Sequence, residues 1–453
     1  MHLHLHLRRT AALAVGCSVA LTTAIGAPAN SDQTVQAAQT VQTAKDRAPA
    51  RAGTAWLSGE LKRGLLKNKE FDFVDYGLSI DAALAFAELA ESRKTKRIAK
   101  AVAADVTSYT TGADFGTDDV YAGATAKAAT LAVVAGKNPT SFGGVDLIAQ
   151  LETLVDPSGR IGDRSEFGDF SNVVGQSYAA WALSEASSVR AGSAVDYLLA
   201  QQCAKGYFRL NFTADATAAD QTCKGAPAAQ RSPDTDATAI AAMALHEVGS
   251  GQKVRTAIKR SAAWLADAQR KNGGFGGGTT TSKPNTNSTG LAGWVLGGLG
   301  FKEPAAKAAA FVRKHQAVAV GRCKTRLSGE AGAIGYDARA VRAGESDGIT
   351  KTTSDQWRRA SAQALPVLSA ARAATGDLSA AGRATSKKVR LRFTGVAPGE
   401  QVCVTGPRVR EAIHGGWRTA RLAVELPRTR SASATYRVVN ADGDRALVVV
   451  DLK

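Results

Sequence analysis

Two kinds of helical segment alternate along most of the chain. One kind has a charged face, as in Arg97–Thr107, Val254–Arg270 and Ala305–His315. The other is rich in Ala and Gly and carries almost no charge, as in Ala237–Leu245 and Gly290–Leu299. A helix with one charged face is half exposed, whereas a helix that is apolar nearly all round is buried. The alternation therefore predicts pairs of outer and inner helices around a shared core.

Each weakly charged segment begins with small and polar residues. This design recurs at Gly77–Leu84, Tyr121–Lys127, Asn172–Tyr178, Pro233–Leu245, Asn287–Ala292 and Arg359–Leu365. Recurrence of one unit indicates a repeat architecture. Open repeat arrays need polar capping repeats, and no such repeat is evident at either end of this one. We therefore expect six outer and inner helix pairs that close into an all-α (α/α)6 barrel over residues 53–375.

The pattern changes after the helical region. Val389–Phe393 alternates apolar and charged residues, and similar short stretches follow at Gln401–Val404, Ala420–Leu426, Thr435–Val439 and Ala446–Leu452. Period-two alternation between turn signals is typical of antiparallel strands. We expect a small all-β, immunoglobulin-like domain over residues 387–453, joined by a linker over residues 376–386.

The first residues have the pattern of an export signal. Arg8 and Arg9 precede an apolar run, and Ala27-Pro28-Ala29 resembles a cleavage site. We expect residues 1–29 to be removed, residues 30–52 to form a flexible lead, and the product to be secreted. No later stretch reaches the roughly 18 apolar residues of a membrane span, so we expect no transmembrane segment.

Four cysteines remain after the predicted cleavage, and an even number in an exported chain favours disulfides. Cys203 and Cys223 flank one polar loop, so we expect them to pair. Cys323 and Cys403 then pair by elimination, which would tie the barrel to the β domain.

Glycine-rich turns precede several of the inner segments. Gln202–Phe208 follows the pattern Q-x(3)-G-x-F, and Gln269–Phe275 follows Q-x(3)-G-G-F. These turns resemble the prenyltransferase and squalene oxidase repeats of terpenoid cyclases and of protein prenyltransferase β-subunits, which are α/α toroids. The helix starts Asp236–Ala239 (D-A-T-A) and Asn287–Ala292 (N-S-T-G-L-A) resemble the cobalamin-binding branch, transcobalamin and intrinsic factor. The resemblance implies the toroid fold, and its cobalamin branch implies a corrinoid as a possible ligand.

If the barrel closes, the N-terminal ends of the inner helices meet at one rim. A concave mouth with convergent polar groups is the default position for a binding site. The alternative is that each polar residue simply caps its own helix. The candidate ligand-binding residues are Asp75, Tyr76, Asp81, Tyr121, Asn172, Gln176, Asp234, Asp236, Asn285, Asn287, Trp357 and Arg358.

One motif suggests catalysis. Asp234-Thr235-Asp236-Ala237-Thr238 resembles the D-x-D-D-T motif of class II terpenoid cyclases, which implies Asp236 as the general acid that protonates an alkene. The chain departs from that motif at Ala237, and it has one barrel where those cyclases have two. A protein prenyltransferase would need zinc ligands, but no histidine lies near a cysteine in a metal-binding spacing. Nor does the chain contain a G-x-S-x-G nucleophile motif or a phosphate-binding loop.

Charge narrows the choice of partner. The chain has 57 Lys and Arg against 40 Asp and Glu, so anionic partners are favoured. No interleaved Arg and aromatic pattern points to nucleic acid. We expect a secreted monomer without a cofactor or metal, which binds a corrinoid-like or apolar small molecule or an anionic cell-surface polymer. The alternative is a terpenoid-cyclase-like lyase or isomerase that uses Asp236.

Overall fold

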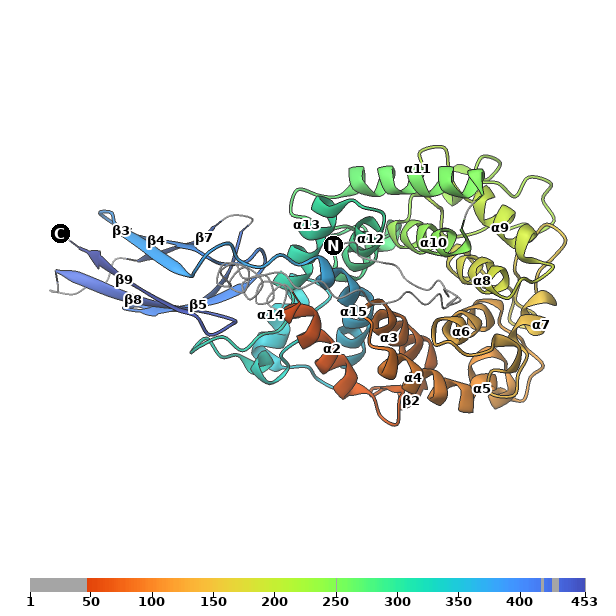
Figure 1. Cartoon of the computed structure of the whole chain (residues 1–453), viewed down its shortest axis with the longest axis horizontal. Coiled ribbons are helices and arrows are strands. Elements are labelled where there is room, and N and C mark those ends of the chain that lie inside the picture. The colour runs from red at the N-terminus through yellow and green to blue at the C-terminus, as the bar shows by residue number, and fades with distance from the viewer. Residues whose placement is uncertain (1–46, 250, 417–418, 426–431, 453) are drawn as a thin grey trace, which may run out of the picture.

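The computed structural model describes residues 47–249, 251–416, 419–425 and 432–452. Within these residues, six inner helices form a closed ring, each in contact with the next and the last with the first. In ring order they are α3 (Tyr76–Glu88), α6 (Ala122–Val134), α8 (Val173–Glu185), α10 (Thr235–Val248), α12 (Thr286–Gly298) and α15 (Ser354–Ala364). Figure 1 shows them around the centre of the larger unit. The predicted α/α toroid is therefore confirmed.

A second layer of helices surrounds this ring. It contains α2 (Ala48–Glu60), α4 (Ser92–Ala104), α7 (Leu147–Glu152), α9 (Ala191–Ala200), α11 (Gln252–Ala268) and α13 (Lys302–Lys314). Shorter elements connect the layers: β1 (Leu66–Asn68), β2 (Phe73–Asp75), α5 (Val106–Thr110), α14 (Ala338–Asp347) and the 3-10 helix η6 (Leu365–Ala370). The remaining 3-10 turns are η1 (Ala113–Phe115), η2 (Pro139–Ser141), η3 (Ala228–Gln230), η4 (Thr279–Thr281) and η5 (Arg326–Gly329).

Helix α2, the first outer helix, packs on α15 and η6 at the other end of the toroid sequence. Its first residues, 48–52, were expected in a flexible lead, and this boundary is corrected. Pro49 occupies the first turn, where a missing N–H costs nothing, and it is buried together with Ala50. The rest of the expected lead up to residue 46, and the expected signal peptide, lie outside the described residues.

The polar starts of the inner helices have a repeated structural role. In five of the six repeats, a backbone N–H that precedes the inner helix in the chain donates to a side-chain hydroxyl or amide oxygen of that helix. The pairs are Leu66 with Ser79, Ile161 with Gln176, Phe208 with Thr238, Phe275 with Thr289, and Ile334 with Ser361. These bonds satisfy buried N–H groups that would otherwise be costly to desolvate.

The glutamines of the glycine-rich turns link neighbouring repeats. Nε2 of Gln202 donates to the carbonyls of Gly206 (3.0 Å) and Ala257 (2.8 Å). Nε2 of Gln269 donates in the same way to the carbonyls of Gly273 (3.0 Å) and Pro304 (2.8 Å). Both glycines have positive φ, and a Cβ at Gly206 would lie 2.5 Å from the carbonyl oxygen of Arg260. The motif shared with the toroid families is therefore structural in this chain.

The C-terminal unit consists of two antiparallel sheets, which confirms the small all-β domain. One sheet has the order β3 (Ser379–Ala384), β4 (Lys388–Thr394), β7 (Ala420–Glu425). The other has the order β6 (Val409–His414), β5 (Gln401–Gly406), β8 (Ser433–Asn440), β9 (Arg445–Asp451). Val389, Phe393, Val404 and Tyr436 belong to the core between them.

The linker expected over residues 376–386 contains strand β3, so that boundary is also corrected. Ser379 to Ala384 pair with β4 in antiparallel register, from Ser379 opposite Thr394 to Ala384 opposite Val389. The strand was not predicted because four of its six residues are Ala or Gly, which provide no alternation to recognise. The strand is held by its pairing with the neighbouring strand β4.

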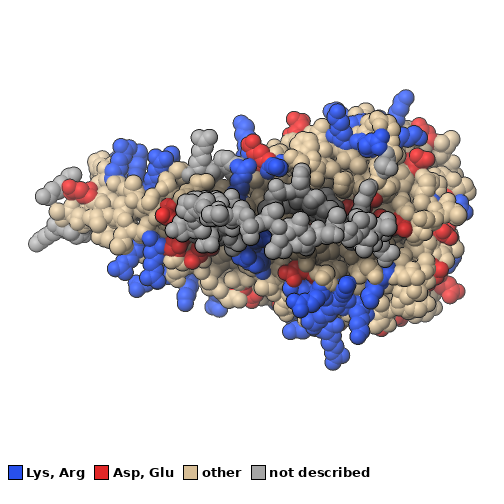
Figure 2. Space-filling view, viewed as in Figure 1, with Lys and Arg blue, Asp and Glu red and all other residues tan. Residues whose placement is uncertain are grey.

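Two disulfides are present, as predicted. Cys203 pairs with Cys223, and Cys323 pairs with Cys403 across the two units, with Cα atoms 5.2 Å and 5.5 Å apart. Arg313 of α13 adds an ion pair to the buried Glu400 of the β unit at 3.7 Å. Lys and Arg side chains lie over both units on the face shown in Figure 2. Among the described helices, none is long and apolar enough to cross a membrane.

Candidate functional site

A narrow cavity of about 50 Å³ runs along the inside of the ring. All six inner helices and the η6 turn contribute to its wall. The lining residues are Asp81, Leu84, Ala85, Glu88, Val134, Tyr178, Trp181, Ile240, Met243, Leu291, Trp294, Ala362, Gln363 and Pro366. The wall is thus mainly apolar and aromatic, with charged groups only at Asp81 and Glu88.

A wider cavity of about 500 Å³ lies at the mouth, beside the N-terminal ends of α6 and α8. It is lined by Asp81, Tyr121, Gly123, Ala124, Lys127, Asp163, Phe170, Ser171, Asn172, Val174, Gly175, Tyr178, Ile240 and Gln363. Four residues line both cavities: Asp81, Tyr178, Ile240 and Gln363. The mouth therefore leads directly into the apolar interior.

An ion pair lies where the two cavities meet. Nζ of Lys127 is 2.5 Å from Oδ1 of Asp81, and both side chains are less than one-fifth exposed. The same Nζ donates to the carbonyl of Gly77 at 3.0 Å and lies 5.9 Å from the centre of the Tyr178 ring. Burial by itself lowers the pKa of Lys127, but the charge of Asp81 outweighs it, and the net pKa is raised. Lys127 therefore stays charged at neutral pH.

The far end of the interior holds a second acid. Burial, together with the charge of Glu247, raises the pKa of Glu88 to about 7. Nε1 of Trp294 donates to Oε2 of Glu88 at 3.1 Å. The carboxyl of Glu88 is thus partly protonated near neutral pH, as expected for an acid in an apolar wall.

Of the predicted site residues, Asp81, Tyr121 and Asn172 line the mouth. Four predicted residues cap inner helices by accepting backbone N–H groups: Asp75 from Leu78 (2.8 Å), Asn172 from Val174 (3.0 Å), Asp234 from Ala237 (2.8 Å) and Asn285 from Ser288 (2.9 Å). Asn172 does both. The capping alternative thus accounts for Asp75, Asp234 and Asn285 without a ligand.

Three predicted residues have structural partners and line neither cavity. Gln176 is fully buried, and its Nε2 donates to the carbonyls of Gly159 and Ala194. Trp357 belongs to a small apolar cluster with Ala317, Leu327 and Ala333. Arg358 binds Glu60 through Nε at 2.7 Å and thereby joins α15 to α2.

Tyr76, in the first turn of α3, also lines neither cavity. Its ring packs beside that of Tyr109, with ring centres 6.1 Å apart.

Asp236 lies on the inner face of α10 but behind the cavity wall. It is one and two turns before Ile240 and Met243, which line the interior, so the three share one helix face. Burial raises the pKa of its carboxyl to about 6. A hydrogen bond from Ser288 opposes this rise, and the charge of Asp234 adds to it. Its Oδ1 has no hydrogen-bond partner among the described residues. The glycine-rich loop covers it, because a Cβ at Gly277 would lie 3.0 Å from Oδ2.

The remaining predicted residue, Asn287, is linked to the mouth through a neighbour. Its Nδ2 donates at 2.7 Å to Oε1 of Gln363, which lines both cavities.

Sequence reasoning missed Lys127 and Gln363 as site residues. Lys127 had a visible signal, since it is the only charged residue between Ala122 and Val134. A single charge on an otherwise uncharged inner helix is costly to bury without a partner. It therefore indicates an ion pair inside the ring, here with Asp81.

Metal binding has no candidate in the part of the chain that the structure describes, where no group of three His, Cys, Asp or Glu could hold an ion. No family model and no curated protein matches the sequence.

Several solved structures have a backbone similar to that of this chain. A protein from Actinoplanes is 15% identical, with 72% of this chain and 99% of that chain covered and a TM-score of 0.49. The type II terpene cyclase MstE from Scytonema, without ligand, is 15% identical, with 72% and 98% covered and a TM-score of 0.48. A glycosidase is 10% identical, with 73% and 98% covered and a TM-score of 0.46.

At these identities and scores, the likeness carries no conclusion about activity. The toroid assignment rests on the closed ring of helices itself. The predicted resemblance to terpenoid cyclases thus holds for the fold, while the resemblance to the cobalamin-binding branch stays a prediction.

Proposed function

We propose that the toroid binds a small amphiphilic molecule, with its apolar part inside the ring and its polar group at the mouth. The observation that carries this proposal is the Asp81–Lys127 ion pair at the junction of the mouth and the apolar interior. A ligand site is usually an apolar pocket with a small number of convergent polar groups. Lys127 would bind an anionic head group, or Asp81 a hydroxyl or amine.

The dimensions favour a slender ligand. A cavity needs about 10–15 Å³ for one water molecule, so the interior, at about 50 Å³, admits only a narrow apolar chain such as an alkyl or prenyl tail. A corrinoid ring would have to remain in the mouth. The two disulfides fit an extracellular carrier, and we include secretion in the proposal.

The first experiment is native mass spectrometry of the full chain purified from its own culture medium, read beside its absorbance spectrum. A retained amphiphile would support the proposal, and a retained corrinoid would identify the carrier predicted from sequence. Recovery of the bare polypeptide alone would count against a tightly held ligand.

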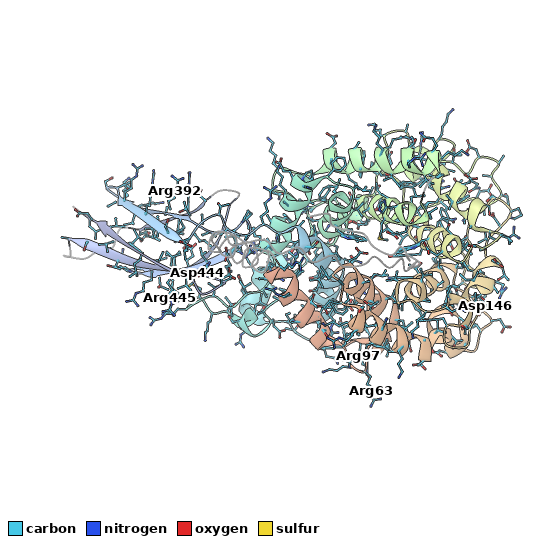
Figure 3. All side chains as sticks on the ribbon, viewed as in Figure 1. Arg63, Arg97, Asp146, Arg392, Asp444 and Arg445 are labelled. Carbon is cyan, nitrogen blue, oxygen red and sulfur yellow. A yellow bond between two sulfur atoms is a disulfide. The ribbon has the colours of Figure 1, made fainter. Side chains whose placement is uncertain are left out.

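The second experiment is a titration with decanoate, followed by the emission of Trp181 and Trp294 in the cavity wall. Ile240→Trp fills the junction of the two cavities and should abolish the response. Arg63→Gln is the matched control, because Arg63 projects outward from the toroid (Figure 3). An unchanged titration of Ile240→Trp would contradict binding inside the ring.

A second candidate function rests on Asp236. A buried carboxyl with a pKa of about 6 and an unpartnered Oδ1 has the properties of a general acid. In this reaction, Asp236 donates its proton to one carbon of an alkene, the C=C π bond breaks, and the other carbon becomes a carbocation. Loss of a proton from the cyclised cation completes an isomerisation. The covering loop at Gly277 would have to move to admit the alkene.

The test is incubation of the full chain with geranylgeraniol, with products analysed by gas chromatography and mass spectrometry. A cyclic isomer that Asp236→Asn abolishes, while decanoate binding is retained, would support the candidate. Asp146→Asn is the control, since Asp146 caps the outer helix α7, an amide can still do so, and the residue lines neither cavity. Absence of any cyclic product from the parent chain would leave the binding proposal alone.

A further inference from the structure

A second concave surface lies between the toroid and the β unit, away from the mouth. This groove has a volume of about 730 Å³. Its toroid side is formed by the turn between α11 and α12, by α13 and by the start of α14. Its other side is formed by Pro398, Gly399, Gly415 and Gly416 of the β unit.

The groove is strongly basic. Six cations line it, namely Lys271, Lys283, Lys307, Lys314, Arg339 and Arg342, against one acid, Asp337. Oδ1 of Asp337 already accepts the backbone N–H groups of Arg339 (2.9 Å) and Ala340 (2.8 Å) as the cap of α14. The net charge of the lining side chains is therefore strongly positive.

Among the described residues, most of these cations have no counter-charge. Lys307 pairs with Glu303 at 2.8 Å. The other five are exposed and make no ion pair with any described residue. The neighbouring histidines do not add to the charge at neutral pH. Burial lowers the pKa of His315, and burial and then the charge of Lys314 lower the pKa of His414 to about 4. The groove thus has positive charge available for a partner.

The groove is a fixed feature of the fold. The Cys323–Cys403 disulfide and the Arg313–Glu400 ion pair hold its two sides together. Gly399 approaches α13 so closely that a Cβ there would lie 2.2 Å from the carbonyl oxygen of Ala310. A ligand would therefore meet a preformed surface.

We propose that this groove binds a linear polyanion, a polyol phosphate chain with phosphodiester links and without bases. Lys307 and Lys314 are seven residues apart on α13, which places them about 10 Å apart along the helix. Cations spread over this length match successive charges on a polymer rather than one small anion. The groove binds independently of the toroid mouth.

The composition of the groove favours this polymer over two others. Nucleic acid without sequence preference is usually held by aromatic side chains that stack on bases. Among the described residues that line the groove, the aromatic side chains are those of Phe311 and His315, and both are buried. A bilayer would require a protruding surface with apolar side chains, whereas this surface is recessed between two units.

The test is binding of a fluorescently labelled synthetic poly(glycerol phosphate) to the full chain, measured by anisotropy at several salt concentrations. The affinity should fall steeply with salt, as for any polyanion held by several cations. The variant Lys314→Gln with Arg342→Gln should weaken binding about tenfold at low salt and make the salt dependence shallower.

The matched control removes two exposed arginines from the outer surface of the β unit. Arg390→Gln with Arg392→Gln changes the net charge equally, because both are exposed residues of strand β4 and neither lines the groove; Figure 3 labels Arg392 on the β unit. This control should keep the affinity within about twofold. An equal loss in both variants would mean binding through net charge alone and would overturn the proposal.

Three further outcomes would also overturn it. One is the absence of poly(glycerol phosphate) binding to the parent chain at low salt. Another is tighter binding of oligothymidylate with the same number of phosphates, because bases would then contribute. Tighter binding to phosphatidylglycerol vesicles than to the soluble polymer would assign the cations to a membrane surface instead.

Discussion

In the mouth of the toroid, Asp81 and Lys127 form a largely buried ion pair, whereas in the basic groove five exposed cations form none with the described residues. The difference follows from desolvation. A charge that leaves water loses several kcal/mol of hydration and needs a partner to recover it. An exposed cation keeps its hydration and can remain unpaired until an external anion arrives.

The comparison implies different modes of recognition. In the mouth, the charges are fixed by their own pairing, so a ligand must compete for Lys127 or Asp81 with a matching group in the right position. In the groove, water and counterions are displaced by a polymer whose charges need no fixed geometry. The mouth is suited to selectivity, and the groove to salt-dependent attachment.

The largest expected effect separates the two sites by breaking the link between the units. Cys323→Ser with Cys403→Ser removes a disulfide that closes a segment of 80 residues. On the chain-entropy model, this lowers the free energy of unfolding by about 4 to 5 kcal/mol. We expect weaker polymer binding and unchanged decanoate binding, measured on the folded variant at low temperature.

The matched control is Cys203→Ser with Cys223→Ser. It removes a disulfide of separation 20 within the toroid and should leave polymer binding intact while costing about 3 kcal/mol. Loss of polymer binding in both variants would show that general destabilisation, not the position of the β unit, is responsible.

The next effect tests the buried pair. Lys127→Met leaves the carboxylate of Asp81 without its counter-charge and should lower the free energy of unfolding by about 3 to 4 kcal/mol, measured by urea denaturation. Asp81→Leu with Lys127→Met removes both charges and should recover most of that stability without recovering ligand binding. Equal destabilisation of the single and double variants would contradict a pair held together by mutual compensation.

A smaller effect, of opposite sign, is expected at the inner end of the ring. The pKa of Glu88 is about 7 in the folded chain and near 4.5 when exposed, so the folded state favours the protonated carboxyl. Its contribution is complete below about pH 4.5 and is lost as the pH rises through 7. Glu88→Gln should therefore be about 3 kcal/mol more stable than the parent at pH 8, and similar to it at pH 4.5.

Denaturation curves at the two pH values check this prediction. A glutamine keeps an oxygen that can accept a hydrogen bond from Nε1 of Trp294. The substitution therefore removes mainly the ionisable carboxyl group. Parallel pH dependence in the parent and the variant would show that Glu88 is not the group responsible.

The sequence predicted the fold well because the signals for it are local and repeated. Small, uncharged helices such as Gly290–Leu299 can only be buried, and six of them leave few alternatives to a ring. The predictions failed for segments whose structure depends on contacts with another part of the chain. Strand β3 pairs through its backbone with β4, and the start of α2 is ordered by burial of Pro49 and Ala50.

The site was predicted less well because two roles call for the same residue types. Asp75 and Asp81 both looked like polar groups at the start of one inner helix. The structure places Asp75 at the cap of α3, whereas Asp81, nearly two turns further, faces the interior. Whether such a residue caps the helix or lines the cavity depends on which helix face points into the closed ring. The groove had no local signal at all, since its lining runs from Lys271 to Gly416.

The smallest expected effect concerns the stability of the groove. Because Lys314 and Arg342 pair with no described residue, Lys314→Gln with Arg342→Gln removes no attraction within the part of the chain that the structure describes. It relieves repulsion among neighbouring cations, so the free energy of unfolding should stay within about 0.5 kcal/mol of the parent value, or rise slightly at low salt. Urea denaturation at about 0.01 M and 1 M salt, where the screening length falls from about 30 Å to 3 Å, measures this difference.

A destabilisation above about 1 kcal/mol at low salt would mean that these cations support the fold. They would then belong with Lys127 as structural charges, and the contrast between the two concave surfaces would fail. A gain at low salt that disappears at high salt would instead locate an uncompensated positive field in the groove. Natural chains retain such self-repulsion only against selection for stability, so it favours a function in binding anions.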